Sequence, residues 1–471
     1  MKKKRFTRLL ALAAALVMVL GVLSACGGNG GNKDSDTPGT AGNDTAGNDT
    51  AGSSTAGDDS AGTPVNTDWE GAEIAAGLSG KVTYMHSGDD YEREMYANVF
   101  KKYMEYAPGV EVEQMYVPSD YSTKVQTLAA ASNLPDLFWV GEAGVRQYAE
   151  AGLLADQSEY LTQYPQLTED IIDGVLDFGN IDGKQYAFPK DWTSYVMYLN
   201  LDLFKEAGID APTNDWTVED YKDLAAKMTK LSDDGSRTDI YGTAINNYRA
   251  DWINWMGNYE AEWFKDGKSN LSCPEALQGL SVMYDLVQAG SAPSPGSVSS
   301  TGDSEDRLFI IGKVAMYPSG RWCIPSFRSE CDFEWDAVEM PKGTTRTCPF
   351  ICSMVAIADT SENKDIAANL LSFQMSDEGL AMVMGSALSL PCYTDLMEND
   401  NYVNTPPSKD AFINSAAYLG TQSQIDACQT GKWSEYNSMI YANLSDAFEG
   451  VTTIEEAVEK IDSQANSTLF N

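Results

Sequence analysis

The stretch formed by residues 182–221 most constrains the fold, because it contains two short strands that a proline separates. The first strand follows the turn Asp182-Gly183 and is interrupted at Pro189, and the second ends at Asn200. A proline cannot donate to a strand ladder, and the residue before it avoids the helical conformation. We therefore interpret this stretch as a segment that leaves one sheet and enters another. This stretch therefore predicts a protein of two lobes, with the first crossing between them near Pro189.

An alternation of strands and helices precedes this crossing. Hydrophobic periodicity predicts strands at residues 80–85, 110–116 and 134–140, and helices at residues 91–106 and 121–131. Such an alternation is typical of a parallel sheet whose ligand-facing loops follow the carboxyl ends of its strands. The predicted fold class is therefore α/β.

The chain after the crossing continues the same pattern. Strands are predicted at residues 241–244, 312–317 and 355–358, and helices at residues 201–207, 218–228, 274–290, 365–384, 433–448 and 453–465, with another from residue 411. Met340-Pro341 is interpreted as the start of a return crossing. At 471 residues the chain exceeds one typical core, which also favours two lobes.

The first 25 residues have the pattern of an export signal. Residues 2–5 are basic, and residues 9–22 form an apolar run that is too short for a stop-transfer helix. The tetrapeptide Leu23-Ser24-Ala25-Cys26 resembles the lipobox of bacterial lipoproteins, in which the cysteine receives a diacylglycerol. This resemblance implies a lipoprotein signal peptide over residues 1–25 and lipidation of Cys26. The alternative is an ordinary cleavable signal beside a chance cysteine.

Residues 26–67 are a low-complexity segment built on repeats of Ala-Gly-Asn-Asp-Thr. Its first large apolar residue is Val65, so the segment cannot offset the entropy cost of ordering. We expect a disordered tether that separates a folded body from a membrane.

The charge of the chain restricts its partners. The formal net charge is −37 at pH 7, which argues against a nucleic-acid binder because phosphate contacts need clustered Lys and Arg. Without its first 25 residues the chain keeps 27 basic and 69 acidic residues, a formal charge of −42. Such acidity disfavours an anionic ligand drawn in by long-range attraction.

The cysteine count leaves the disulfide state open. Seven cysteines remain besides Cys26, and an odd number cannot all pair within one chain. They could form one or more disulfides or remain mostly free thiols. Cys348 and Cys352 are four residues apart but no histidine lies near them, so we expect no metal site.

Several runs resemble the carbohydrate type of extracellular solute-binding proteins, the maltodextrin and multiple-sugar lipoproteins of ABC importers. These are Gly-x-x-Tyr-x-x-Pro at residues 183–189, Leu-Phe-x-x-Ala-Gly at residues 203–208, and Gly-Lys-x-Ala-Met at residues 312–316 followed by Trp322. The resemblance covers residues 79–469 in consistent order. The chain departs from the family pattern at Leu199 and Val218, where aromatic residues are usual.

The resemblance implies a two-lobe periplasmic-binding-protein-like fold with a ligand cleft and three linkers, near Pro189, Pro341 and Pro391. Lobe 1 would comprise residues 79–188 and 345–390, and lobe 2 residues 189–344 and 391–471. The protein would be a monomer, lipid-anchored at the extracellular face of the bacterial cell membrane. It would capture a sugar or oligosaccharide and deliver it to the transmembrane permease subunits of an ABC importer.

The residues themselves argue against an enzyme and against any cofactor. His86 is the only histidine, no Gly-x-Ser-x-Gly elbow accompanies it, and no phosphate-binding Gly-rich loop occurs. Paired carboxylates of a secreted carbohydrate-active hydrolase remain an alternative, because acidic residues are too numerous to exclude them. A binding protein for a peptide or another polar solute is the second alternative.

Sugars present apolar C–H faces and hydroxyl groups, so a sugar site needs flat aromatic rings and side chains that hydrogen-bond hydroxyls. The resemblance places Asp89, Asp90, Glu142, Trp322 and either Trp252 or Trp255 at ligand-contacting positions. Large aromatic residues are often buried, so about half of the candidates could instead be core. The full candidate set is Asp89, Asp90, Trp139, Glu142, Asp191, Trp192, Tyr195, Trp252, Trp255, Arg321, Trp322, Tyr393, Trp433 and Tyr436.

Overall fold

The computed structural model describes residues 68–88, 90–169, 171–172, 174–384, 389–393, 396, 408–419 and 422–471. The predicted signal peptide, Cys26, the predicted tether and Asp89 lie outside the described residues. Among the helices that are described, none has both the length and the hydropathy that crossing a bilayer requires.

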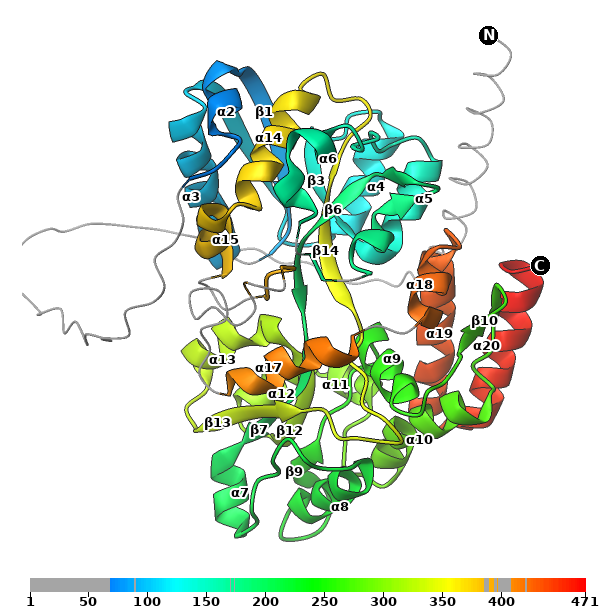
Figure 1. Ribbon diagram of the computed structural model, residues 1–471. Helices are drawn as coiled ribbons and strands as arrows, with labels where there is room; N and C mark the ends of the chain where they lie inside the picture. The colour runs from blue at the N-terminus through cyan, green and yellow to red at the C-terminus, as the bar shows by residue number, and fades with distance from the viewer. Residues whose placement is uncertain are drawn as a thin grey trace, which may run out of the picture. The chain divides into compact units, whose positions relative to one another are not determined.

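The first sheet has five strands in the order β2-β1-β3-β14-β6. The strands β2 and β3 pair with β1 in parallel, as the alternation predicted, whereas β14 runs antiparallel to both β3 and β6. Figure 1 shows α3 beside this sheet, where it packs against β2. The bounds are β1 Ser79–His86, α3 Asp90–Tyr106, β2 Gly109–Tyr116, α4 Tyr121–Ala130, β3 Leu137–Gly141, β6 Ala187–Thr193 and β14 Ile351–Ile357.

The predicted helix at residues 365–384 is in fact two helices, α14 (Lys364–Gln374) and α15 (Asp377–Met384). Ser376 separates them, since its hydroxyl donates to the Phe373 carbonyl oxygen and accepts from the Gly379 N–H. A side chain at Gly379 would lie 2.2 Å from the same carbonyl, so the sharp corner needs glycine there. Periodicity alone could not show this break, because both helices bury apolar residues.

Smaller elements complete the first half of the chain. They are α2 Ala72–Gly77, η1 Glu142–Gly144, α5 Val145–Glu150, α6 Tyr160–Gln163, η2 Pro165–Leu167, η3 Leu176–Phe178, β4 Asn180–Ile181 and β5 Lys184–Gln185.

The second sheet has five strands in the order β13-β7-β12-β9-β8. The strand β7 runs antiparallel to β12 and β13, and β12 runs parallel to β9. The two helices that follow β7 along the chain carry side-chain caps, Asn200 at the start of α7 and a Thr217–Asp220 capping box at the start of α8. The bounds are β7 Tyr195–Asn200, α7 Leu201–Ala207, α8 Val218–Met228, β8 Lys230–Leu231, β9 Thr238–Thr243, β12 Val314–Gly320 and β13 Trp335–Glu339.

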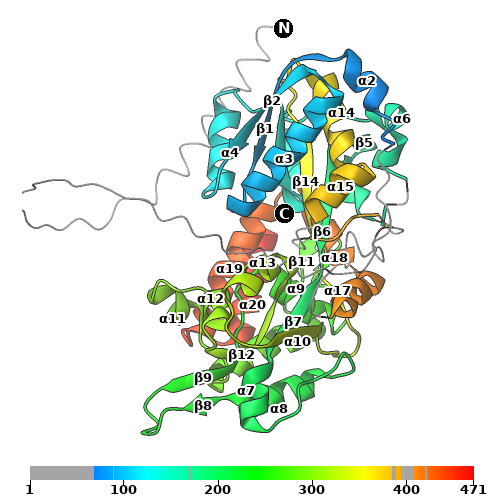
Figure 2. The same ribbon diagram turned by 90° about the vertical axis from the view of Figure 1, so that its left-hand side faces the viewer.

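Helices from distant parts of the chain pack beside this second sheet. In Figures 1 and 2, α19 and α20 lie side by side near α10, and the apolar side chains between them are buried. The predicted helix at residues 433–448 is confirmed with the same bounds. The bounds are α9 Arg249–Gly257, β10 Phe264–Lys265, β11 Lys268–Ser269, α10 Pro274–Gln288, α11 Pro295–Ser300, α12 Glu305–Ile310, η4 Arg321–Cys323, α13 Ile324–Glu330, α17 Lys409–Asn414, η5 Ser415–Tyr418, α18 Gln422–Cys428, α19 Trp433–Phe448 and α20 Ile454–Thr468.

The first crossing lies at Ser194, not near Pro189 as predicted. The strand β6 continues through Pro189 to Thr193, and Ser194 alone separates it from β7 in the other sheet. The ladder accommodates the proline because the β14–β6 register shifts between Ser353 and Met354, the partner of Pro189.

The other two predicted crossings begin close to the expected places. The return crossing occupies residues 340–350, between β13 and β14. Leu390 and Tyr393 still form isolated bridges with Trp192 and Ile171 beside the first sheet. The chain therefore stays with the first sheet at least to Tyr393, slightly beyond the predicted boundary at residue 390.

Candidate functional site

A cavity of about 600 Å³ is bounded by residues of both sheets and of the helices that follow their strands. From the first sheet come the end of β3 and the start of β14. From the second come β7, β12 and the loop between β9 and α9. The lining residues are Gly141, Glu142, Ile351, Cys352, Ser353, Tyr195, Asn246, Asn247, Tyr248, Arg249, Pro295, Ser299, Glu305, Tyr317, Ser319, Trp322 and Tyr441.

A smaller cavity of about 160 Å³ adjoins it. Trp322, Ile351 and Ser353 line both cavities, so the two spaces share a wall. The remaining lining residues of the smaller cavity are Glu92, Trp139, Lys190, Asp191, Trp192, Thr193 and Ser389. The two cavities together form one candidate site.

Three aromatic side chains of the larger cavity expose much of their surface. Tyr248 is 38% exposed, Trp322 37% and Tyr441 53%. The rings of Trp322 and Tyr248 lie nearly perpendicular, with centroids 6.4 Å apart. The Trp322 ring also contacts Tyr195, with ring centroids 6.3 Å apart. Exposed rings in a concave site offer flat faces on which an apolar ligand surface can stack.

An ion pair between the buried Glu142 and the partly exposed Arg249 joins the two sheets at the larger cavity. Glu142, in the turn after β3, places a carboxylate oxygen 2.8 Å from the guanidinium of Arg249, the first residue of α9. Burial raises the pKa of the Glu142 carboxyl, and the Arg249 guanidinium opposes this effect. Breaking such a pair would leave a buried charge without compensation.

A second buried ion pair lies at the smaller cavity. The Lys190 ammonium is 2.5 Å from an Asp191 carboxylate oxygen and 4.1 Å from the centroid of the Trp139 ring. The other Asp191 oxygen accepts from the Ser353 N–H at 3.3 Å. The neighbouring residues of β6 thus hold a fixed pair of opposite charges beside an aromatic face.

A hydrogen-bonded network forms one wall of the larger cavity. The Tyr195 hydroxyl lies 2.7 Å from a carboxyl oxygen of the buried Asp251, whose other oxygen accepts from the Asn246 N–H at 2.6 Å. The Asn246 side chain donates to the Tyr195 hydroxyl and to the Pro318 carbonyl oxygen, and it accepts from Tyr317. Burial raises the pKa of Asp251 to about 8. The network fixes Tyr195, Asn246 and Tyr317 in one arrangement.

Six of the residues proposed from sequence line one or both cavities: Trp139, Glu142, Asp191, Trp192, Tyr195 and Trp322. Asp90 does not, because it is exposed at the start of α3 and pairs with Arg93. Arg321 does not, because it is fully buried with its guanidinium 5.5 Å from the Phe412 ring centroid.

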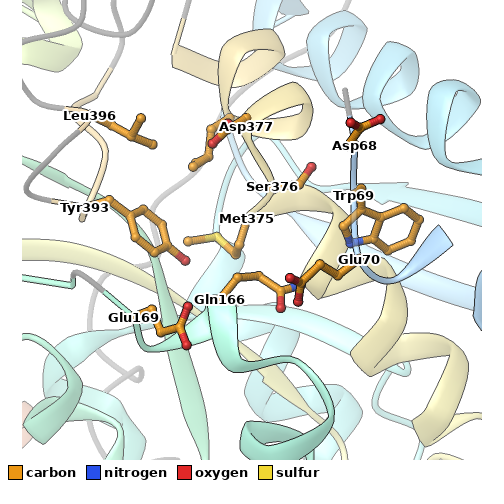
Figure 3. Close-up of a pocket in the computed structure, with 11 residues that line it drawn as sticks. Asp68, Trp69, Glu70, Gln166, Glu169, Met375, Ser376, Asp377, Tyr393 and Leu396 are labelled. Atoms are coloured by element: carbon orange, nitrogen blue, oxygen red, sulfur yellow. The ribbon is translucent and has the colours of Figure 1, made fainter. Parts of the chain in front are cut away.

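Tyr393 lies at a separate cavity of about 220 Å³ on the side of the first sheet. Figure 3 shows Tyr393 and Glu169 on one side of this cavity and Trp69 on the other. The structure therefore does not bring Tyr393 to the candidate site.

Four predicted aromatic contacts, Trp252, Trp255, Trp433 and Tyr436, are core residues and reach neither cavity of the candidate site. On α9 every residue from Ala250 to Gly257 is buried, so both of its tryptophans are enclosed. Trp255 stacks on Tyr221, with ring centroids 5.4 Å apart and planes 11° apart. On α19 the buried residues Trp433, Tyr436, Ile440, Leu444 and Ala447 follow helical spacing, which marks one apolar face.

Sequence reasoning missed Asn246, Tyr248 and Arg249, although a signal for them existed. They follow β9, which is parallel to β12, and polar residues after parallel strands are the positions expected to face a ligand. It also missed Tyr441, which is next to the buried Ile440 and therefore points away from the apolar face of α19.

Comparison with known proteins gives a family match over most of this region. The model of a family described as bacterial extracellular solute-binding protein matches residues 98–410. A binding protein of Brucella abortus is 26% identical over 306 residues, which cover 63% of this chain and 72% of the relative. The maltotriose-binding protein of Pyrococcus abyssi is 24% identical over 255 residues, which cover 53% of this chain and 51% of the relative.

Solved structures share the fold. An ABC substrate-binding protein from Listeria monocytogenes, in complex with cycloalternan, superposes with a TM-score of 0.73 at 23% identity, covering 83% of this chain and 99% of that chain. The GacH receptor of Streptomyces glaucescens, also studied with acarbose, gives a TM-score of 0.71 at 19% identity, with 83% and 98% covered. The predicted two-lobe α/β architecture is thereby confirmed.

Proposed function

Because the chain belongs to the bacterial extracellular solute-binding proteins, we propose that its two adjoining cavities bind a neutral sugar or oligosaccharide for an ABC importer. Members of this family are binding proteins, so the hydrolase alternative is set aside. His86, the one histidine, lines neither cavity, and burial lowers its pKa to about 4.

The observation that carries the proposal is the grouping of exposed aromatic rings. Among the exposed large hydrophobic side chains of the described residues are four aromatics, Tyr91, Tyr248, Trp322 and Tyr441. All of these except Tyr91 line the larger cavity. Sugar rings have apolar C–H faces that stack on such aromatics, while Asn246, Asn247 and Ser319 supply polar groups for hydroxyls.

The charges of the site favour a neutral ligand over an anionic one. The cationic side chains that line the two cavities are Arg249 and Lys190, and each is paired with a carboxylate, Glu142 and Asp191 respectively. Glu305 adds a further acidic group to the larger cavity. A phosphate or carboxylate on the ligand would therefore find no unpaired cation among these lining residues. The free-energy cost of removing its hydration would not be offset.

The sugar names of relatives support the same conclusion. The Pyrococcus relative is named for maltotriose, and the Listeria structure contains cycloalternan. The larger cavity, about 600 Å³, has the size typical of small-molecule sites.

The proposal extends to domain motion and to anchoring. Each sheet with its helices would act as one lobe, and rotation about the three crossings would open and close the site, with the Glu142–Arg249 pair forming on closure. Residues 1–25 would direct export, Cys26 would carry the lipid, and residues 26–67 would tether a monomeric body at the extracellular face of the membrane, where it meets the permease subunits.

The test is a thermal-shift screen of the protein without residues 1–66 against neutral sugars, sugar phosphates, uronic acids and short peptides. A ligand at a hundred times its Kd stabilises the folded state by about 2.7 kcal/mol. We expect this shift with at least one neutral mono- or oligosaccharide, which should be recovered chemically unchanged. Stabilisation by phosphorylated or acidic sugars alone, or by peptides alone, would overturn the proposal.

A further inference from the structure

Both hydrogens of the Asn246 side-chain amide are used inside the protein. The nitrogen donates to the Pro318 carbonyl oxygen at 2.9 Å and to the Tyr195 hydroxyl at 3.2 Å. Because a carbonyl oxygen can only accept, the nitrogen must face Pro318, and Oδ1 accepts from the Tyr317 hydroxyl at 3.2 Å. An amide oxygen has two lone pairs. Asn246, which is partly exposed at the larger cavity, therefore keeps one acceptor position and no donor.

Asn247 reaches the same state with different partners. Its amide nitrogen donates to the Tyr441 carbonyl oxygen at 2.9 Å and to Ser445 Oγ at 2.8 Å. The Ser445 hydroxyl donates its own hydrogen to the Tyr441 carbonyl, so Oγ accepts from Asn247 and fixes the orientation of that amide. The Asn247 side chain is 8% exposed, and its Oδ1 has no hydrogen-bond partner among the described residues. Both lone pairs of this oxygen are therefore unused.

The two amides belong to different walls of the larger cavity. Asn246 is bonded to β12 through Pro318, and Asn247 is bonded to α19 through Tyr441. Both residues lie in the loop between β9 and α9 and line the cavity. The Asn246 backbone N–H donates to Asp251 at 2.6 Å, which holds this loop against the start of α9. Each amide oxygen is therefore a fixed acceptor, unlike a serine hydroxyl, which can rotate to donate or to accept.

The direction of a hydrogen bond matters at these two oxygens. A buried acceptor without a partner costs free energy, and Asn247 Oδ1 carries this cost in the empty protein. A ligand group that donates removes the cost at Asn247 and fills the remaining acceptor position of Asn246. A ligand group that only accepts leaves both oxygens unpaired and places a further electronegative atom beside them.

We propose that Asn246 and Asn247 determine the specificity of the site by each accepting a hydrogen bond from the ligand. This inference rests on the proposed function and adds the ligand chemistry, because the sugar must carry a free hydroxyl or amino group at two positions, one for each amide. A fluorine, an ether or a hydrogen atom at either position removes the donor. The expected loss of affinity is roughly tenfold to a hundredfold at each position, because a polar group of the site is then left unpaired.

The test replaces one hydroxyl at a time on a neutral sugar that stabilises the protein without residues 1–66, beginning with maltotriose. Fluorine is close to a hydroxyl in size but does not donate, whereas an amino group does. In titration calorimetry, fluorine should weaken binding roughly tenfold to a hundredfold at two positions, and an amino group there should keep the affinity within about threefold.

The outcomes separate this inference from the proposed function. Equal binding of the native sugar and all of its fluorinated forms would overturn the inference while the proposed function stands. An amino group that weakens binding as much as fluorine does would overturn it in the same way. Failure of every neutral sugar to bind would overturn both.

Alanine variants assign each position to its residue. In Asn247→Ala, fluorine at one of the two positions should no longer weaken binding, while the sensitivity at the other persists, and Asn246→Ala should show the reverse. A purely structural role would weaken the native and fluorinated sugars by the same factor, which would overturn the inference for that residue. Asn443→Ala is the matched control with both sensitivities retained, because Asn443 is a buried asparagine of α19 that lines neither cavity. If an alanine variant fails to fold, the fluorinated series with the parent protein still decides.

Discussion

The two groups of aromatic side chains beside the second sheet have similar composition but opposite surroundings. One group, Trp252, Trp255, Trp263, Trp433 and Tyr436, is buried among α9, α10, α19 and α20. The other, Tyr248, Trp322 and Tyr441, lines the larger cavity with much of each ring exposed. We call them the core group and the cavity group.

The two groups are close together in the sequence. Tyr248 precedes Trp252 by four residues, and Tyr441 follows Tyr436 by five on the same helix. Residue type therefore does not show whether an aromatic side chain is buried or lines the cavity. Its position does, because the cavity residues stand before a helix or away from the helix's apolar face. The difference predicts that substitutions in the core group lower stability and that substitutions in the cavity group lower affinity.

The largest effect is expected for the core residue Trp255. Trp255→Ala removes a ring that is fully buried and stacked on Tyr221, so the free energy of unfolding should fall by about 3–5 kcal/mol. Urea unfolding measures this loss, and titration calorimetry on the fraction that remains folded should show an almost unchanged affinity. A large loss of affinity at parental stability would place Trp255 in the cavity group.

The next effect is expected for Trp322 of the cavity group. Trp322→Ala should weaken sugar binding roughly tenfold to a thousandfold, since it removes a stacking face and its buried area. Stability without ligand should change by less than about 1 kcal/mol, because the ring is partly exposed. Tyr91→Ala is the matched control, because Tyr91 is 52% exposed but lines neither cavity. Equal effects of the two substitutions on affinity would remove Trp322 from the site.

A smaller, pH-dependent effect on stability is expected for Asp251, which stands between Tyr248 of the cavity group and Trp252 of the core group in the sequence. Asp251, on α9, has a pKa of about 8 when folded, because burial raises it and Glu305 adds a minor contribution, against about 3.9 when unfolded. Between these values the folded protein keeps a proton that the unfolded chain has lost. The contribution of Asp251 to stability is therefore greatest below about pH 4 and is lost as pH rises to about 8.

Asp251→Asn tests this linkage, because an amide has the shape of the protonated carboxyl and can keep the contacts with Tyr195 and Asn246. The stability of the variant relative to the parent should increase with pH, by at most about 1.4 kcal/mol per pH unit. Urea unfolding from about pH 5 to 8.5 measures it, with the exposed Asp90→Asn as control. A difference that stays constant with pH would contradict the assignment.

The smallest effects are expected for two tyrosines of α19. Tyr441→Ala should weaken binding about twofold to tenfold, because this ring is half exposed at the edge of the cavity, with stability nearly unchanged. Tyr436→Phe should instead leave affinity unchanged and cost about 1 kcal/mol of stability, because it removes the hydroxyl that hydrogen-bonds Ser269. The reverse pattern would exchange the two residues between the groups.

The fold was more predictable than the site. The strands at residues 80–85 and 110–116 and the helix at residues 433–448 follow from periodicity and are found in the structure. The crossing at Ser194 was displaced from Pro189 because a register shift in the partner strand accommodates the proline, which local sequence does not reveal. The family resemblance placed Trp322 and either Trp252 or Trp255 at ligand-contacting positions. In the structure Trp322 lines the cavity, whereas Trp252 and Trp255 are buried.

The sequence by itself determined the α/β alternation, the presence of two sheets and the acidic charge, because these depend on local periodicity, proline positions and composition. Only the tertiary structure decided which aromatics are enclosed, since that depends on which helices cover a residue. It also decided that Glu142 pairs with Arg249 and that Tyr195 hydrogen-bonds Asp251. Such contacts join residues far apart in the chain, and their geometry is set by sheet register and crossings that no local pattern encodes.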